Sequence, residues 1–146
     1  MRKKNVLFIC THNSCRSQMA EGWLRNLYGE QYTAFSAGTE KTRVKPMADR
    51  VMKEAGVDIS SQYSKTKRDL TDVDFDIIIT VCDRARNTCP MPPNGKAEIM
   101  HKSFFDPSDV QGTEQEKLEA FRKTRDEIRE WVKQTFNPDH PKHNIR

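Results

Sequence analysis

Four short segments of the chain have the hydrophobic pattern of β-strands. Residues 4–10 and 75–81 are continuous apolar runs rich in β-branched and aromatic residues, a pattern typical of strands that are buried on both faces. Residues 32–37 alternate weakly between apolar and polar positions, and residues 97–100 form a shorter apolar segment. We therefore expect four strands, the strongest of which contains three consecutive isoleucines.

Three other segments have apolar positions at three- and four-residue spacing, which predicts amphipathic helices. We expect helices over residues 17–28 and 46–55, ended by Gly29 and Gly56. The longest helix is expected over residues 113–136. Its inward stripe is predicted to comprise Leu118, Phe121, Ile128, Trp131 or Val132, and Phe136.

The order of these elements indicates an α/β fold. Strands that alternate with helices form parallel sheets joined by right-handed crossovers. We expect a small four-stranded parallel sheet with helices on both faces, formed by a single domain over residues 1–136. Residues 82–95 are rich in proline and predict a long irregular connection. The tail, residues 137–146, has one large apolar residue, and we expect it to be flexible.

Composition and charge narrow the class of protein. The chain has 146 residues and a net charge of +4, which favours anionic ligands but is too small to indicate nucleic acid. The apolar runs are too short to span a bilayer, and the basic start of the chain is not followed by a signal sequence. We expect a cytoplasmic monomer that binds neither nucleic acid nor a membrane. Its four cysteines then indicate thiol chemistry or metal binding, because cytosolic thiols stay reduced.

Residues 10–17 link the first predicted strand to the first predicted helix and have the chemistry of an oxyanion site. A loop that enters a helix points backbone N–H groups inward, and the helix dipole adds positive potential. Arg16 can clamp two oxygens of an anion, and Cys10 in that field should have a depressed pKa and act as a nucleophile. Ser17 can donate a hydrogen bond to the sulfur. The predicted binding residues are Thr11, His12, Asn13, Ser14, Cys15 and Arg16.

Less specific interpretations of this loop stay open. Cys10 can be a buried cysteine at a strand end, since unpaired cysteines commonly fill cores. We interpret the side chain of Cys15 as a packing residue of the loop, and that of His12 as a tolerated polar residue rather than a catalytic base.

The loop and the residues that follow it, Gln18-Met19-Ala20-Glu21-Gly22, resemble the low-molecular-weight tyrosine phosphatase fold. More narrowly, they resemble the thioredoxin-coupled arsenate reductases. The resemblance continues through residues 36–39, 59–60, 81–82, 89–90, 106–107 and 121–128, and so covers nearly the whole chain. It implies that Asp106 protonates the departing oxygen, although an Asp-Pro pair alone is commonly a turn former.

Cys82 and Cys89 discriminate between the two activities of these relatives. A phosphatase needs one thiolate, whereas arsenate bound to Cys10 can be reduced when Cys82 attacks the Cys10 sulfur and releases arsenite. Cys89 can then attack Cys82 by thiol–disulfide exchange. The resemblance assigns these roles too, and implies thioredoxin as the reductant of the final disulfide.

No bound metal or other cofactor is expected. The spacing of Cys82 and Cys89 does not fit a zinc site. The resemblance implies a potassium site beside the anion loop, built from groups matching Asn13, Glu21 and Ser36 and an acidic residue at a fourth position. Lys65 stands at that position, and its ammonium can occupy the place of the cation, which argues against potassium dependence. Residues 65–68 are otherwise interpreted as a solvated basic face.

The sequence therefore favours an arsenate reductase in which thioredoxin regenerates a three-cysteine relay. A low-molecular-weight protein tyrosine phosphatase is the first alternative, although such relatives commonly have Tyr after the Asp-Pro pair, where this chain has Ser108. The second is a sensor that binds an oxyanion or an arsenical without turnover.

Overall fold

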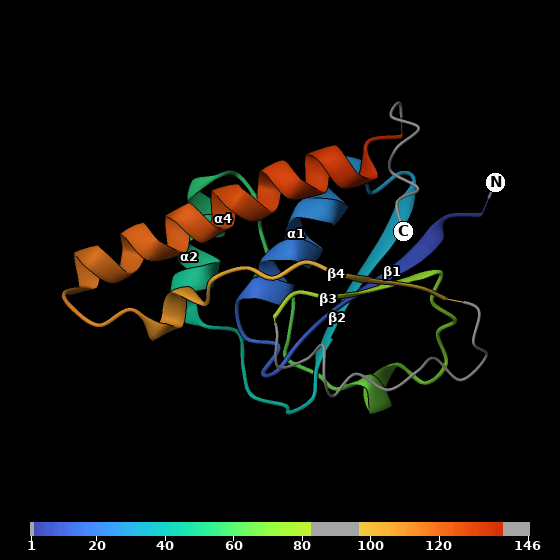
Figure 1. Ribbon diagram of the computed structural model, residues 1–146, viewed down its shortest axis with the longest axis horizontal. Helices are drawn as coiled ribbons and strands as arrows, with labels where there is room; N and C mark the ends of the chain where they lie inside the picture. The colour runs from blue at the N-terminus through green and yellow to red at the C-terminus, as the bar shows by residue number, and fades with distance from the viewer. Residues whose placement is uncertain (1, 83–96, 139–146) are drawn as a thin grey trace.

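The computed structural model describes residues 2–82 and 97–138 of the chain. The strands in this part form one sheet in the order β2-β1-β3-β4, and every neighbouring pair is parallel. The predicted four-stranded parallel sheet of an α/β fold is thus confirmed (Figure 1). The strands are β1 (Lys4–Cys10), β2 (Tyr32–Gly38), β3 (Ile77–Thr80) and β4 (Glu98–His101).

The three predicted helices are also present, as α1 (Arg16–Tyr28), α2 (Pro46–Glu54) and α4 (Glu114–Phe136). In Figure 1 the long helix α4 lies across α1 and α2, and it contacts both of them. Two 3-10 helices were not predicted, because a single turn is too short to show a hydrophobic period. They are η1 (Lys67–Leu70) and η2 (Pro107–Asp109).

The apolar residues are concentrated on both faces of the central strand β1. The Phe8 side chain is fully buried, and its ring meets those of Trp131 and Phe136 in α4 at centroid distances of 6.2 and 6.1 Å. Side chains alternate along a strand, so Phe35 of β2 lies on the opposite face, where its ring contacts that of Phe75 at 5.4 Å. Strand β1 is therefore buried on both faces, as the continuous apolar run predicted, and the three described α-helices pack against one another.

The ends of the elements differ slightly from the prediction. The third strand covers only Ile77–Thr80 of the predicted residues 75–81, and the fourth begins one residue later than predicted, at Glu98. Helix α4 begins after Thr113, whose hydroxyl accepts a hydrogen bond from the Glu116 N–H at 3.1 Å. The flexible tail predicted for residues 137–146 lies almost entirely outside the described residues.

The carboxyl ends of β1 and β3 meet at one edge of the sheet, which is where ligands bind in such folds. Cys10 is the last residue of β1, and Cys82 follows the end of β3 by two positions. Helix α1 begins at the same edge, directly after the loop that Cys10 opens. The predicted meeting of these two cysteines at one sheet edge is confirmed.

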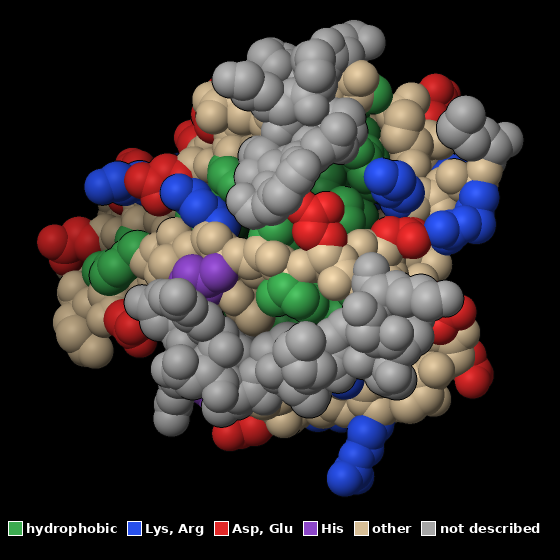
Figure 2. Space-filling model, turned by 45° about the vertical axis from the view of Figure 1, so that its right-hand side comes forward, with side chains coloured by type: hydrophobic (Ala, Val, Ile, Leu, Met, Phe, Trp, Pro, Cys, Tyr) green, Lys and Arg blue, Asp and Glu red, His purple; other side chains and the backbone are tan. Residues whose placement is uncertain are grey.

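Charged side chains of both signs are interspersed over the face of the molecule shown in Figure 2. The small positive excess is therefore not gathered into one field on this face. Within the described part of the chain, no helix is both long and apolar enough to cross a membrane.

Candidate active site

The loop between β1 and α1 turns its carbonyl oxygens outward. Each carbonyl of residues 11–14 accepts a hydrogen bond from a group outside the loop. In a trans peptide the N–H points away from the C=O, so the N–H groups of residues 12–15 point toward the inside of the loop. Such a ring of amides at a helix N-terminus is a site for an anion. The donors are Thr39 N (2.9 Å) and Glu40 N (3.0 Å) to Thr11, Thr42 Oγ1 (2.9 Å) and Ser64 Oγ (3.1 Å) to His12, Gln18 Nε2 (3.0 Å) to Asn13 and Lys45 N (2.8 Å) to Ser14.

Gly38 and Asn13 give the loop its shape. A Cβ atom on Gly38 would lie 2.7 Å from the Thr11 carbonyl oxygen and 2.8 Å from the Asn13 nitrogen, so only glycine lets β2 approach the loop this closely. Asn13 has a φ of 52°, in the left-handed region that asparagine tolerates better than most residues. It is fully buried.

Ser17 lies beside the predicted nucleophile. Its hydroxyl oxygen is 3.1 Å from the Cys10 sulfur and accepts a hydrogen bond from Asn13 Nδ2 at 2.8 Å. Because the Ser17 oxygen already accepts from Asn13, its own proton can be donated to the sulfur. The position of Ser17 thus matches its predicted role as the donor that stabilises the Cys10 thiolate.

The depressed pKa that we predicted for Cys10 is not found. The neighbouring Cys82 side chain and burial raise the pKa of Cys10 well above its ordinary value, while hydrogen bonds from Ser17 lower it. The prediction was wrong because it counted the amides and the arginine of the loop but not the second thiol that lies against the first.

Two of the three cysteines of the predicted relay come together. Cys82 is buried, and its sulfur lies 3.6 Å from the hydroxyl of Thr11, a residue of the anion loop. Thr11 directly follows Cys10, so the sulfur of Cys82 lies beside the start of the loop that Cys10 opens. Cys89, the third member, lies outside the described residues.

Arg16 does not point two donors at an open anion site, as the predicted clamp requires. Its Nη1 donates to the Phe104 carbonyl and its Nη2 to the Asp106 carboxylate, each at 3.1 Å. Its Nε is buried and has no hydrogen-bond partner among the described residues. Buried donors are normally satisfied, so this nitrogen remains available for an acceptor such as an oxyanion.

The predicted acid, Asp106, is brought to the loop by its contact with Arg16. Burial raises its pKa, but the Ser108 hydroxyl, at 2.7 Å, and the Arg16 charge outweigh this and hold the pKa below its ordinary value. Asp106 is therefore a carboxylate near neutral pH in this arrangement. A role as proton donor requires that an incoming anion draws Arg16 away and raises the pKa again.

The Cys15 side chain contacts the proposed acid as well as packing in the loop, whereas the His12 side chain lies at the surface. Burial, and then the nearby Asp106 carboxylate, raise the pKa of Cys15 to about 12, so it stays a thiol, and its sulfur donates a hydrogen bond to Asp106 Oδ1 at 3.5 Å. The His12 side chain is 47% exposed and pairs with Glu40 at 3.4 Å. Only the backbone of His12 takes part in the anion loop.

A buried glutamine that fixes Asn13 was not predicted from the sequence. Gln18 is fully buried, and its Nε2 donates to both oxygens of Asn13 and to the Tyr63 carbonyl, at 2.9 to 3.0 Å. Its place directly after Ser17 was visible in the motif. Nothing in the hydrophobic pattern, however, indicates that a polar residue in the first turn of a helix is buried.

The residues that the resemblance assigns to potassium do not fit that ion. The Lys65 ammonium lies 3.8 Å from Glu21 Oε1. A potassium ion bound at this site would need to contact the same carboxylate. The ammonium thus lies beside this carboxylate, and independence of potassium stays a prediction. The interpretation of residues 65–68 as a solvated basic face is wrong for Lys65, which is only 5% exposed. Among residues 2–82 and 97–138, no group of three or more His, Cys, Asp or Glu side chains could hold a metal ion.

The chain is similar to known proteins over most of its length. Residues 5–142 match the family described as low molecular weight phosphotyrosine protein phosphatase. An arsenate reductase of Bacillus licheniformis is 46% identical over 138 residues, which cover 91% of this chain and 95% of the relative.

Two solved structures are similar to this chain in fold and sequence. A structure described as an arsenate reductase in the phosphate binding state has a TM-score of 0.74 and 34% identity, and the match covers 90% of this chain and 95% of that one. A thioredoxin-dependent arsenate reductase of Corynebacterium glutamicum has a TM-score of 0.62 and 28% identity, covering 90% of this chain and 63% of that one.

Proposed function

Because the chain belongs to the low molecular weight phosphotyrosine protein phosphatase family, and its relatives at 42–46% identity are arsenate reductases, we propose that it reduces arsenate to arsenite. The observation that carries the proposal is the buried Cys82 side chain, whose sulfur lies 3.6 Å from the hydroxyl of Thr11, the residue directly after Cys10. Hydrolysis of a phosphate ester needs only one thiolate at this site. A second thiol against the first is what a reductase needs.

In the first step the amides of residues 12–15 and Arg16 bind arsenate, the Cys10 thiol gives its proton to an arsenate oxygen, and the resulting thiolate attacks arsenic. A sulfur–arsenic bond forms and an arsenic–hydroxyl bond breaks. The hydroxyl leaves as water after it accepts a proton from Asp106. Arg16 is within reach of both the anion and Asp106, so it can couple binding of the anion to the protonation of that carboxyl.

In the second step the Cys82 thiolate attacks the Cys10 sulfur. A disulfide forms, the sulfur–arsenic bond breaks, and its electron pair stays on arsenic. Arsenic is thereby reduced from As(V) to As(III) and leaves as arsenite, while the two thiolates are oxidised to the disulfide. Cys89 then attacks Cys82, frees Cys10 and leaves a Cys82–Cys89 disulfide.

Thioredoxin is the proposed reductant of that disulfide. The thioredoxin-dependent relative of Corynebacterium glutamicum supports this assignment. Its dithiol would be oxidised as the Cys82–Cys89 disulfide returns to two thiols.

The proposal is tested by arsenate-dependent oxidation of NADPH in the presence of thioredoxin and thioredoxin reductase. Cys10→Ser, Cys82→Ser and Cys89→Ser are each expected to abolish turnover, whereas Cys15→Ala is the matched cysteine control and should keep most of it. Turnover that survives Cys82→Ser or Cys89→Ser would contradict the relay. Mass spectrometry after one turnover without reductant should find the Cys82–Cys89 disulfide.

The alternative activity is that of a phosphatase, which the anion loop and Asp106 fit equally well. Ser108, which stands where such relatives commonly have Tyr, is 2.7 Å from Asp106 and offers no aromatic ring to a phosphotyrosine. Comparing the kcat/KM values for arsenate and for a phosphotyrosine peptide decides between the two. A sensor would bind arsenate with one-to-one stoichiometry and show no turnover.

A further inference from the structure

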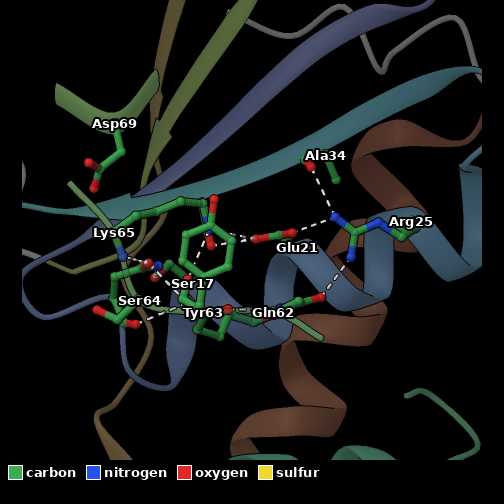
Figure 3. Close-up of polar contacts among 12 residues, drawn as sticks. Ser17, Glu21, Arg25, Ala34, Gln62, Tyr63, Ser64, Lys65 and Asp69 are labelled. Atoms are coloured by element: carbon green, nitrogen blue, oxygen red, sulfur yellow. Dashed lines mark hydrogen bonds and ion pairs between the residues drawn. The ribbon is translucent and has the colours of Figure 1, made fainter. Parts of the chain in front are cut away.

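A lysine and a glutamate are buried together behind the anion loop (Figure 3). The side chains of Lys65 and Glu21 are each 6% exposed, and Lys65 Nζ lies 3.8 Å from Glu21 Oε1. The ammonium also donates to the Tyr63 carbonyl at 3.0 Å and lies 4.6 Å from the centre of the Tyr63 ring. Charged side chains are almost never buried to this degree unless they are paired, so the two residues depend on each other.

The Glu21 carboxylate is held from both sides. Ser36 Oγ donates to Oε1 at 2.5 Å, on the same oxygen that faces Lys65, and the Arg25 guanidinium pairs with Oε2. Arg25 is itself fixed by Gln62 Oε1 at 2.7 Å. The carboxylate is therefore a fixed negative charge, and the position of the Lys65 ammonium follows from it (Figure 3).

Lys65 is connected to the nucleophile by a short chain of hydrogen bonds. Its backbone N–H donates to Asn13 Oδ1 at 2.9 Å, and Asn13 Nδ2 donates to the Ser17 hydroxyl at 2.8 Å. The Ser17 oxygen is 3.1 Å from the Cys10 sulfur. On its other side the Lys65 carbonyl accepts from the Gly38 N–H at 2.8 Å, at the point where β2 meets the loop. A displacement of Lys65 would thus reach Cys10 through Asn13.

The groups that contact the ammonium are a carboxylate oxygen of Glu21, the backbone carbonyl oxygen of Tyr63 and the Tyr63 ring. Oxygen ligands with one net negative charge suit a hard cation. Here the positive charge is supplied by the ammonium of Lys65. We propose that Lys65 is a positioning residue whose ammonium is a built-in cation for the anion loop. The protein then needs no dissociable potassium, and loss of the ammonium creates a requirement for a monovalent cation.

The test compares Lys65→Ala with the unaltered protein in choline chloride, potassium chloride and methylammonium chloride at equal ionic strength. Three properties are measured: Tm, the Kd for inorganic phosphate and kcat/KM for arsenate. We expect the unaltered protein to give the same values in all three salts. In choline chloride the Lys65→Ala variant should lose roughly tenfold in kcat/KM. This is the size of effect seen in metal sites when a residue that orients the metal-binding groups is removed. Potassium or methylammonium should restore most of this loss and raise Tm.

Two further variants separate the role of the charge from a general effect on folding. Lys65→Met fills the space without the charge, so it should show the same loss but no rescue by either cation. Lys53→Ala removes an exposed lysine of α2 and should behave like the unaltered protein in every salt. If Lys65→Ala is unfolded in choline chloride, recovery of the folded state in potassium chloride supports the proposal.

Failure of the proposal is distinguishable from failure of the proposed function. Only kcat/KM rests on arsenate reduction, whereas Tm and phosphate binding do not. A Lys65→Ala variant whose Tm and phosphate Kd are the same in all three salts would overturn the built-in cation. So would an unaltered protein whose Tm or phosphate Kd depends on potassium.

Discussion

The guanidinium of Arg16 and the carboxylate of Asp106 form an ion pair at 3.1 Å across the mouth of the anion loop, although 90 residues separate them in the sequence. The same two residues are proposed to bind the oxyanion and to protonate its departing oxygen. An arriving anion needs the guanidinium that Asp106 holds. Asp106 therefore competes with the substrate for Arg16 before it assists the reaction.

This competition predicts opposite effects of Asp106→Asn on binding and on turnover. Removal of the carboxylate releases Arg16 and removes a negative charge beside the anion, so the Kd for inorganic phosphate should fall several-fold. Turnover of arsenate should fall by roughly 10²- to 10⁴-fold, the usual contribution of a general acid. Calorimetry and steady-state kinetics measure the two effects. Asp109→Asn, at an exposed carboxylate of η2, is the control. An unchanged kcat would exclude the acid role.

Asp76 is predicted to make stability depend on pH. Its carboxylate accepts from the Asn5 N–H at 2.7 Å and from two nitrogens of Arg2 at 2.9 and 3.2 Å, and so fixes the start of β1. The hydrogen bond from Arg2 lowers the pKa of Asp76. Since the folded pKa is depressed, this stabilisation is present above the unfolded pKa of about 3.9 and is lost as pH falls through the folded value.

The Asp76→Asn variant should therefore be less stable at pH 7, by about 1 kcal/mol, a typical value for a lost hydrogen bond. The difference should shrink as pH falls below about 4, where the carboxyl of the unaltered protein also becomes protonated. Urea unfolding at a series of pH values measures it. Asp72→Asn changes an exposed carboxylate of the same segment and should give no such trend. A constant difference across the pH range would contradict the assignment to Asp76.

Gly38 and Gly56 allow the shape of the loop to be tested apart from stability. In Gly38→Ala the new methyl group meets the Thr11 carbonyl and the Asn13 nitrogen, so we expect a loss of about 1–3 kcal/mol in stability, typical of overpacking, together with weaker phosphate binding. Gly56 has a φ of 84° and open space around it, so Gly56→Ala should lose about 1–2 kcal/mol through backbone strain alone. Its phosphate Kd should not change. Equal effects of both variants on phosphate binding would argue against the steric role of Gly38.

The sequence predicted the parts of this site that depend on the chain direction and missed those that depend on side-chain contacts. The ends of two buried apolar runs placed Cys10 and Cys82 at one edge of the sheet, and the loop before α1 marked the anion site. The burial of Gln18 and the pairing of Arg16 with Asp106 could not be predicted, because no local pattern encodes which polar groups meet across 90 residues. The site of Lys65 was found only through the resemblance to relatives.

The effect of Cys82 on the pKa of Cys10 leads to the last prediction, on the reactivity of the nucleophile. Cys82 is the largest cause of the raised pKa of Cys10, and Ser17 acts in the opposite direction. In a Cys89→Ser background, Cys82→Ala should therefore lower the pKa of Cys10, and Ser17→Ala should raise it. Thiolates react with iodoacetamide and thiols do not, so the rate of alkylation at Cys10 as a function of pH reports both shifts.

Mass spectrometry assigns the alkylation to individual cysteines. Cys15, with a pKa of about 12, should stay unmodified near neutral pH and serves as the internal control. Faster alkylation of Cys10 in Cys82→Ala means that the second thiol holds Cys10 in its protonated form until a substrate anion is bound. Slower or unchanged alkylation would mean that the amides and Arg16 already keep Cys10 as a thiolate. The contact with Cys82 would then serve only the step in which arsenite is released.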